Sequence, residues 1–210
     1  MAQNLSSWFK KFMQRFFGKK KEVKLGLYGP PNAGKTTLAN RISMDWLGEE
    51  MGTVSDVAHE TREVQLKEKV TIRSGKKELT FNLVDTPGIA TRIDYEDFLK
   101  AGMKKAEARK RAKEATKGVI DAIKWLDDMD AVVIVLDSTA DPYSQVNITI
   151  IGNLQAKDVP VLIVANKIDL KKSNLKRITD AFPQYDVVGI SAKDGVNIET
   201  FYESLFDLMK

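Results

Sequence analysis

The segment GPPNAGKTT, Gly29 to Thr37, constrains the fold of this 210-residue chain more than any other feature. It fits the pattern G-x-x-x-x-G-K-[ST], which needs a strand before it and a helix after it. Alternating apolar residues predict a strand over residues 23–29, and residues 35–47 predict a helix. A glycine-rich turn in this context points successive backbone N–H groups inward at phosphate oxygens.

The residue types inside the segment predict a phosphate and magnesium site. Lys35 reaches the β- and γ-phosphates of a nucleotide, and the Thr36 hydroxyl is able to ligate Mg²⁺. The N-terminus of the following helix adds the positive end of its dipole. The competing interpretation is a chance glycine turn, which the strand–loop–helix context makes much weaker.

The remaining sequence alternates between strand and helix patterns. Continuous apolar runs predict buried parallel strands, and Ser74-Gly75 joins two extended runs into an antiparallel hairpin. We expect strands at residues 63–72, 78–84, 131–136, 159–165 and 186–190, and helices at residues 143–157, 171–181 and 196–209. The pattern predicts a doubly wound α/β domain over residues 22–210, preceded by a separate helix over residues 1–21.

Composition excludes several classes of site. The chain has no cysteine and one histidine, which rules out disulfide scaffolds, thiolate zinc sites, cysteine nucleophiles and a histidine-based metal cluster. No apolar run approaches the ~18 residues of a membrane-spanning helix, and the N-terminal residues lack the pattern of a secretory signal. We expect a soluble, cytoplasmic protein.

The net charge of +4 is unevenly distributed. Residues 1–24 and residues 100–117 each carry a net charge of +6, so the remainder carries −8. Basic charge confined to two segments favours local anionic partners over general nucleic-acid binding.

The tetrapeptide Asn166-Lys167-Ile168-Asp169 follows a predicted buried strand. A carboxylate at Asp169 is able to accept both the N1–H and the N2 amino hydrogens of guanine, whereas adenine has no such pair of donors. Asn166 would brace the neighbouring loops, and the stem of Lys167 would cover the base. After a phosphate loop and at the end of a parallel strand, this tetrapeptide predicts a guanine site.

Two further motifs follow predicted strands. In Asp85-Thr86-Pro87-Gly88, the Asp85 carboxylate fits a group that holds Mg²⁺ through water, and the Gly88 N–H fits a contact to the γ-phosphate. Ser191-Ala192-Lys193 follows the last strand and would contact the base.

A polar loop contains His59-Glu60-Thr61-Arg62. Thr61 is the candidate for a second hydroxyl ligand of Mg²⁺, and Thr53 is an alternative in the same loop. His59 is a candidate general base, but a solvated loop histidine is the preferred interpretation because phosphoryl transfer depends on positioning more than on proton removal.

Five motifs in this order resemble the Ras-like GTPase fold. The Pro-Asn of GPPNAGKTT, the pair Thr61-Arg62 and DTPG are similar to the Era/Der/TrmE branch of bacterial and archaeal GTPases. The resemblance implies a six-stranded sheet with one antiparallel strand, binding of GTP or GDP with Mg²⁺, and a nucleotide switch. It implies Mg²⁺ ligation by Thr36, Thr61 and Asp85, catalytic roles for Lys35, Thr61 and Gly88, and nucleotide contacts from Asn32, Ala33, Gly34, Lys35, Thr36, Thr37, Asp85, Gly88, Asn166, Lys167, Asp169, Ser191, Ala192 and Lys193.

The chain departs from the Ras-type pattern at Ile89, which occupies the place of a water-orienting glutamine. Isoleucine cannot orient water, so intrinsic hydrolysis is expected to be slow. The resemblance also implies a K⁺ ion beside the phosphates, held partly by Asn32, and stimulation of hydrolysis through a GTP-dependent homodimer. Glu60 stands where relatives often have a second threonine, which weakens the expected ion-holding loop.

Residues 5–17 show apolar side chains at helical spacing, with lysine and arginine outside that face. Dense aromatics beside basic residues are typical of a helix in a membrane interface, where each basic residue adds roughly 1 kcal/mol on anionic lipid. Packing on the domain or on a second subunit is the alternative, and nucleic acid is the least favoured. The predicted membrane-facing residues are Leu5, Trp8, Phe9, Phe12, Met13, Phe16 and Phe17.

Residues 104–127 predict one long helix whose first half is strongly basic. Its expected buried seam consists of Ala108, Ala112, Ala115, Val119, Ile123 and Leu126. The basic half is interpreted as an effector or membrane-facing surface, with a solvated helix face as an equal alternative.

Taken together, these features predict a GTPase that acts as a nucleotide switch on the inner face of the cell membrane. The first alternative is a ribosome-assembly GTPase, although the chain ends at Lys210 with no sign of the RNA-binding module that such relatives carry. The second is a scaffold that holds GTP with little turnover.

Overall fold

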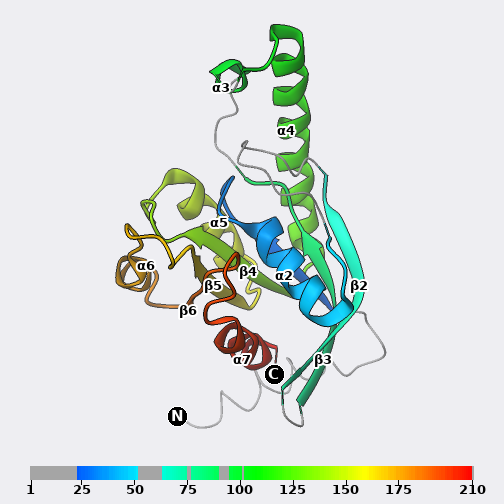
Figure 1. Ribbon diagram of the computed structural model, residues 1–210, viewed down its shortest axis with the longest axis vertical. Helices are drawn as coiled ribbons and strands as arrows, with labels where there is room; N and C mark the ends of the chain where they lie inside the picture. Colours follow the sequence, from blue (N-terminus) through cyan, green and yellow to red (C-terminus); the bar gives the residue numbers. More distant parts are fainter. Residues whose placement is uncertain (1–22, 52–62, 75–76, 90–94, 101, 210) are drawn as a thin grey trace.

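The computed structural model describes residues 23–51, 63–74, 77–89, 95–100 and 102–209. Six strands form one sheet in the order β2-β3-β1-β4-β5-β6, in which only the β2–β3 pair is antiparallel (Figure 1). This confirms the six-stranded α/β sheet with one antiparallel strand. The strands are β1 (Lys24–Tyr28), β2 (Gln65–Ser74), β3 (Lys77–Asp85), β4 (Ala131–Asp137), β5 (Val161–Asn166) and β6 (Asp186–Gly189).

Helices cover both faces of the sheet. One apolar cluster joins the sheet to α2 and α7, and a second joins its other face to α4, α5 and α6. The helices are α2 (Lys35–Leu47), α3 (Tyr95–Lys100), α4 (Lys105–Trp125), α5 (Gln145–Ala156), α6 (Leu175–Ala181) and α7 (Ile198–Leu208), and α4 continues into a 3-10 turn, η1 (Leu126–Asp128).

The central strand β4 shows why the continuous apolar runs form parallel strands. Val133 and Val135 belong to the cluster under α2 and α7, whereas Val132 and Ile134 belong to the other cluster. Successive side chains of a strand point to opposite faces, so a strand that is covered on both sides needs apolar residues at every position.

Capping side chains set two helix boundaries. The Asn174 side chain accepts a hydrogen bond from the Arg177 N–H, so α6 begins at Leu175 and not at Lys171 as the sequence pattern predicts. Ser144 caps α5 in the same way through the Asn147 N–H. The six-residue helix α3 is too short to give a periodic signal and was not expected.

The predicted seam of α4 is wrong at one position. Ala122 is fully buried, whereas Ile123 is 49% exposed, and the side chain of Ala115 lies outside the described residues. Ala108 and Leu126 are buried as predicted. Neighbouring residues in a helix are separated by about 100° of rotation, so only one of two adjacent apolar residues can face the sheet here.

Several sequence predictions fall outside the described residues. These include the amphipathic helix of residues 1–21, the switch candidates Thr61 and Thr53, and His59. Within the part of the chain that the structure describes, no helix is long and apolar enough to cross a membrane.

Candidate nucleotide-binding site

The predicted motifs converge at one edge of the sheet. GPPNAGKTT follows β1, DTPG begins at the last residue of β3, the NKID tetrapeptide begins at the last residue of β5, and SAK begins two residues after the end of β6. These strands are parallel, so their carboxyl ends meet at the same edge, where ligands bind in open α/β sheets.

The phosphate loop has a backbone that only glycine accommodates at two positions. Gly29 has φ 148°, and a Cβ there would lie 2.2 Å from the carbonyl oxygen of Val135. Gly34 has φ 94°, and a Cβ there would lie 2.2 Å from Nδ2 of Asn166. Both the left-handed backbone and the close neighbours exclude a side chain.

Asn166 joins the phosphate loop to the loop after β6 through two hydrogen bonds. Its Nδ2 donates to the Ala33 carbonyl at 2.9 Å, and its Oδ1 accepts from the Ala192 N–H at 3.0 Å. The side chain is only 3% exposed. The structure therefore agrees with the expectation that Asn166 braces the loops.

Lys35, Thr36 and Asp85 form a buried polar cluster at the start of α2. The Lys35 ammonium donates to the Pro30 carbonyl at 2.9 Å, and Thr36 Oγ1 donates to Asp85 Oδ2 at 2.7 Å. Burial lowers the pKa of Lys35 to about 8, against the opposing effect of Asp85. Burial likewise raises the pKa of Asp85 to about 6, although the Thr36 hydrogen bond and the Lys35 charge act in the other direction.

This cluster fits a magnesium ion. Asp85 is fully buried, and its Oδ1 has no hydrogen-bond partner among the described residues. A buried carboxylate oxygen without a partner is costly unless a cation approaches it. Thr36 and Asp85 would hold Mg²⁺, Asp85 through water, and Lys35 lies beside them.

The raised pKa of Asp85 predicts an unusual pH dependence of stability in the nucleotide-free protein. Between its ordinary value of 3.8 and about 6, the folded state binds more protons at Asp85 than the unfolded state does. The free energy of unfolding from this group therefore rises as pH falls through that window, by up to ~3 kcal/mol.

Urea unfolding in EDTA checks this prediction. Relative to Asp85→Asn, the wild-type protein should gain stability between about pH 6.5 and pH 4.5. An equal pH dependence in both proteins would show that Asp85 is not desolvated in the folded state.

Gly88 lies against the phosphate loop. A Cβ at Gly88 would lie 2.7 Å from Cα and 2.8 Å from N of Pro31, and the next residue, Ile89, donates its N–H to the Gly29 carbonyl at 3.1 Å. The Ile89 side chain is buried in the apolar cluster that contains Tyr28 and Ala122. It therefore faces the core, which is consistent with the expectation that it does not orient water.

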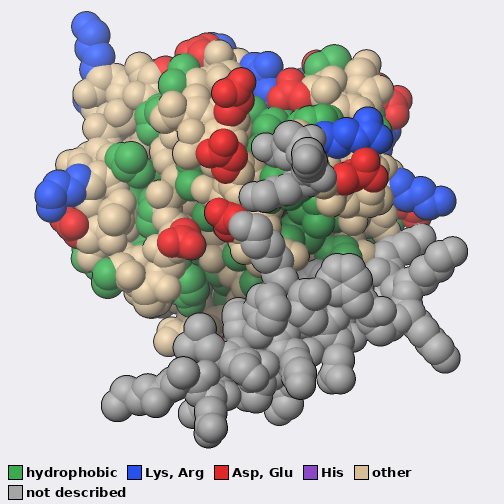
Figure 2. All heavy atoms as spheres, turned by 90° about the horizontal axis from the view of Figure 1, so that it is seen from below, with side chains coloured by type: hydrophobic (Ala, Val, Ile, Leu, Met, Phe, Trp, Pro, Cys, Tyr) green, Lys and Arg blue, Asp and Glu red, His purple; other side chains and the backbone are tan. Residues whose placement is uncertain are grey.

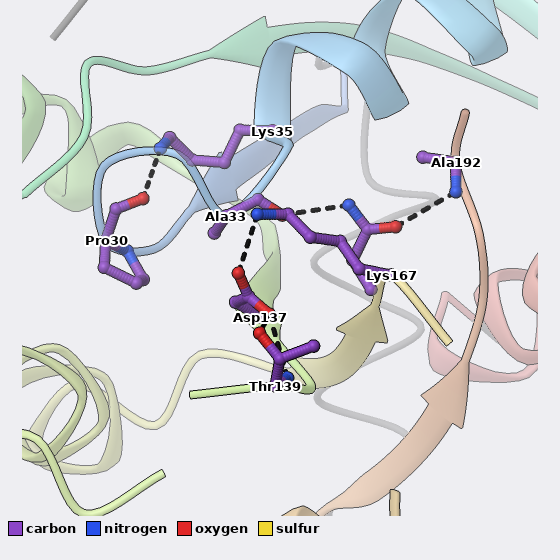
Figure 3. A network of polar contacts seen from close by, with 8 residues as sticks. Pro30, Ala33, Lys35, Asp137, Thr139, Lys167 and Ala192 are labelled. Carbon is purple, nitrogen blue, oxygen red and sulfur yellow. Dashed lines mark hydrogen bonds and ion pairs between the residues drawn. The ribbon is translucent and has the colours of Figure 1, made fainter. Parts of the chain in front are cut away.

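The region predicted to bind the base is held by a second network. Lys167 Nζ donates to Asp137 Oδ2 at 2.6 Å, while the Thr139 N–H and hydroxyl donate to Asp137 Oδ1 at 2.9 and 2.7 Å (Figure 3). Burial alone would raise the pKa of Asp137, but the bonds from Lys167 and Thr139 hold it below its ordinary value. The Asp137 carboxylate thus holds the Lys167 ammonium in place, two residues before Asp169, which is exposed.

The loop after β6 completes the site. Ser191 and Ala192 are buried and Lys193 is exposed. Ser191 Oγ accepts from the Asp194 N–H at 3.2 Å, which orders the turn. The structure thus brings together the described residues predicted for phosphate, Mg²⁺ and guanine, while Thr61 lies outside the described residues.

Arg41 is a structural contributor that the sequence did not indicate. Its Nε and Nη2 donate to the carbonyls of Ala192 and Lys193 at 3.2 and 2.8 Å. Asp45 lies 3.9 Å from Arg41 and accepts at 2.9 Å from the Tyr202 hydroxyl. A guanidinium on α2 therefore holds the base loop from outside the motifs.

The sequence analysis did not identify Asp137 and Thr139 either. A carboxylate directly after a predicted buried strand is a signal that could have identified Asp137.

Loss of the hydrogen bonds from Arg41 to the loop after β6 should accelerate nucleotide release. Arg41→Gln loses at least one of two hydrogen bonds to loop carbonyls, each worth about 1 kcal/mol, so dissociation of GDP and of GTP should be about 10-fold faster. Release of a fluorescent GDP measures this. Arg177→Gln, which breaks an exposed ion pair with Asp141, is the matched control and should leave release unchanged.

The fold and this site define a P-loop nucleotide-binding protein with the sheet order and motif placement of a GTPase domain. Residues 24–167 match the 50S ribosome-binding GTPase family. The chain belongs to this family, and it is similar to GTPases named Era, Der and MnmE.

Curated relatives carry these names. The chain is 30% identical over 181 residues to GTPase Era of Alkaliphilus oremlandii, covering 82% of this chain and 50% of that protein. It is 32% identical over 163 residues to GTPase Der of Maridesulfovibrio salexigens, covering 77% and 31%. It is 29% identical over 198 residues to the tRNA modification GTPase MnmE of Chlorobium chlorochromatii, covering 90% and 36%. The chain therefore spans half or less of the length of these relatives.

Solved structures show the same fold. An Aquifex aeolicus Era variant bound to GDP·AlF4⁻ superimposes with a TM-score of 0.67 at 22% identity, covering 91% of this chain and 58% of that one. Era in complex with MgGDPNP and nucleotides 1506–1542 of 16S ribosomal RNA gives a TM-score of 0.67 at 23% identity, covering 90% and 57%.

Proposed function

We propose that this chain binds GTP with Mg²⁺ and hydrolyses it to GDP and phosphate. The observation that supports the proposal most strongly is the pair of hydrogen bonds from Asn166, which join the phosphate loop to the base loop. Lys35 would contact the β- and γ-phosphates, the Gly88 N–H would sense the γ-phosphate, and Asp169 would select guanine. Mg²⁺, when bound, would neutralise charge on the β- and γ-phosphates.

Turnover should be slow, and K⁺ should stimulate it. Ile89 faces the core, so no side chain directly after Gly88 orients the attacking water. Asn32, which adopts φ 59° in the phosphate loop, is the proposed partial ligand of a K⁺ ion. GTP-dependent association of two G domains would complete the ion site.

Potassium should therefore raise the hydrolysis rate relative to sodium. The expected factor is about 10 to 10³, below the 10³–10⁵ of an arginine finger. Phosphate release at equal ionic strength in KCl and NaCl measures it, with Asn32→Ala as the variant that should lose the difference. Equal rates in both salts would contradict the potassium proposal, and no single turnover in either would favour the scaffold alternative.

The second part of the proposal is that the protein is a nucleotide-dependent switch on an anionic membrane surface, such as the inner face of the cell membrane. The apolar face of residues 5–17 and the basic residues around it support this. Flotation with vesicles of neutral or anionic lipid tests it, with GDP or a non-hydrolysable GTP analogue bound.

The matched variant for this test is Trp8→Glu with Phe12→Glu in the full chain. Binding to anionic vesicles that the variant loses and that changes with nucleotide is the expected result. Binding indifferent to nucleotide would make the segment a plain anchor. Failure of the wild-type protein to float with either nucleotide bound would contradict the membrane proposal. It would favour the ribosome-assembly alternative, which the family description and the Era–16S rRNA complex support.

A further inference from the structure

The exposed side of α4 combines basic and apolar side chains in one stripe. We define the outer face of α4 as six exposed residues at successive spacings of three or one: Lys113, Thr116, Lys117, Ile120, Ile123 and Lys124. Residues at this spacing lie on one side of a helix. Ile120 and Ile123 are each 49% exposed, so two large apolar side chains lie among the lysines of this face.

Acidic residues of α4 lie along one flank of this face. Glu107, Glu114 and Asp121 follow one another at intervals of seven residues, and Asp121 is four residues from Lys117 and three from Lys124, so these carboxylates border the lysines on that flank. Lys110 lies 3.9 Å from Glu114. The six residues of the outer face themselves include three lysines and no carboxylate, and the acidic residues border the face on one flank.

The rest of the molecule has the opposite charge. Outside the two basic segments the chain carries −8. Figure 2 shows several acidic side chains across the middle of the described surface seen from below, which is the end away from the projecting half of α4 (Figure 1). The positive charge of the described residues is therefore concentrated in residues 100–117, most of which belong to α4.

The core holds α4 so that this face stays exposed. The Tyr28 hydroxyl donates to the Ala122 carbonyl at 3.0 Å, and Leu126 is buried. Lys24 lies 5.4 Å from the Trp125 ring, so the first described strand begins beside the end of α4.

We propose that the outer face of α4 is a second lipid contact, which binds anionic headgroups beside the membrane helix of residues 1–21. This inference rests on the proposed membrane function. The lysine stems lie along the apolar part of an interface while their ammonium groups contact phosphates, and the isoleucines enter the headgroup boundary. A nucleic acid would use the lysines but has no use for two exposed isoleucines, and the face has no aromatic side chain on which bases stack.

Vesicle flotation of the full chain with K113Q/K117Q/K124Q tests the inference. Each lysine adds affinity on anionic lipid, so removal of three should weaken binding to phosphatidylserine vesicles on the order of 100-fold at low salt. Ile120→Ser with Ile123→Ser should weaken binding to the same vesicles by about 10-fold, with less dependence on salt. GDP binding should be unchanged in both variants, which shows that they are folded.

The matched control is K171Q/K172Q/K176Q, which removes equal charge from three exposed lysines at and before α6. This control should bind vesicles like the wild-type protein. If the wild-type protein floats and the α4 variants float equally well, the α4 inference is wrong while the membrane function stands. If the wild-type protein does not float at all, both are overturned. An α4 variant that loses binding to duplex RNA but not to vesicles would also overturn the lipid assignment.

Discussion

Asp169→Asn should abolish tight GTP binding and create binding of xanthine nucleotides. The aspartate carboxylate accepts two hydrogen bonds from guanine, at N1–H and at the N2 amine. An asparagine accepts only one and directs its own amide donors at the amine. Sites built around such a pair discriminate by about 10⁴-fold, so the affinity for GTP should fall by at least ~10³-fold.

Xanthine carries a carbonyl oxygen where guanine carries the N2 amine. The amide of an asparagine at position 169 is able to donate a hydrogen bond to this oxygen. The variant should therefore bind a xanthine nucleotide more tightly than the wild-type protein does, and displacement of a fluorescent nucleotide measures both affinities. Asp194→Asn, in the exposed turn after Ser191, is the matched control with no expected effect. Unchanged GTP affinity in Asp169→Asn would place the base elsewhere.

Much of the fold was predictable because its signals are local. The α2 helix has the predicted bounds, and the hairpin of β2 and β3 pairs as expected. Each motif follows a strand, so sequence order alone placed the described motifs at one edge of the sheet. The site residues within the motifs were predictable for the same reason.

The contacts that hold the site together were less predictable because they join distant residues. Arg41 is 151 residues from Ala192, and Tyr202 is 157 residues from Asp45. On its own, Arg41 is an ordinary polar residue of a surface helix. Its role appears only when α2 packs beside the loop after β6.

The sequence pattern also did not determine which side of α4 faces the sheet. Ala122 and Ile123 are both apolar, and helical spacing from Val119 to Leu126 favoured Ile123 for the seam. In the structure the space against the sheet is filled by Leu126, Met129 and Tyr28, so only the small Ala122 fits at that turn. The larger residue is left exposed, and this exposure underlies the proposed lipid contact.

Asn166→Asp should weaken GDP and GTP alike, on the order of 10²- to 10³-fold, without changing the preference for guanine. The substitution keeps the acceptor for the Ala192 N–H but replaces the donor to the Ala33 carbonyl with a carboxylate oxygen. Two oxygens would then face each other in a buried site, where an unsatisfied acceptor costs about 1–3 kcal/mol and an unpaired charge costs more. The free energy of unfolding should fall by at least ~2 kcal/mol for the same reason.

Lower pH separates this mechanism from a general packing defect. A protonated carboxyl at position 166 is able to donate to the Ala33 carbonyl, so the affinity loss of Asn166→Asp should shrink as pH falls, whereas that of Asn166→Ala should not. Asn153→Asp is the matched control, since Asn153 also donates to a backbone carbonyl, that of Thr149, but on the exposed side of α5. Nucleotide affinity unchanged in Asn166→Asp would mean that the phosphate and base loops hold their places without Asn166, and the bridge between them would no longer account for the site.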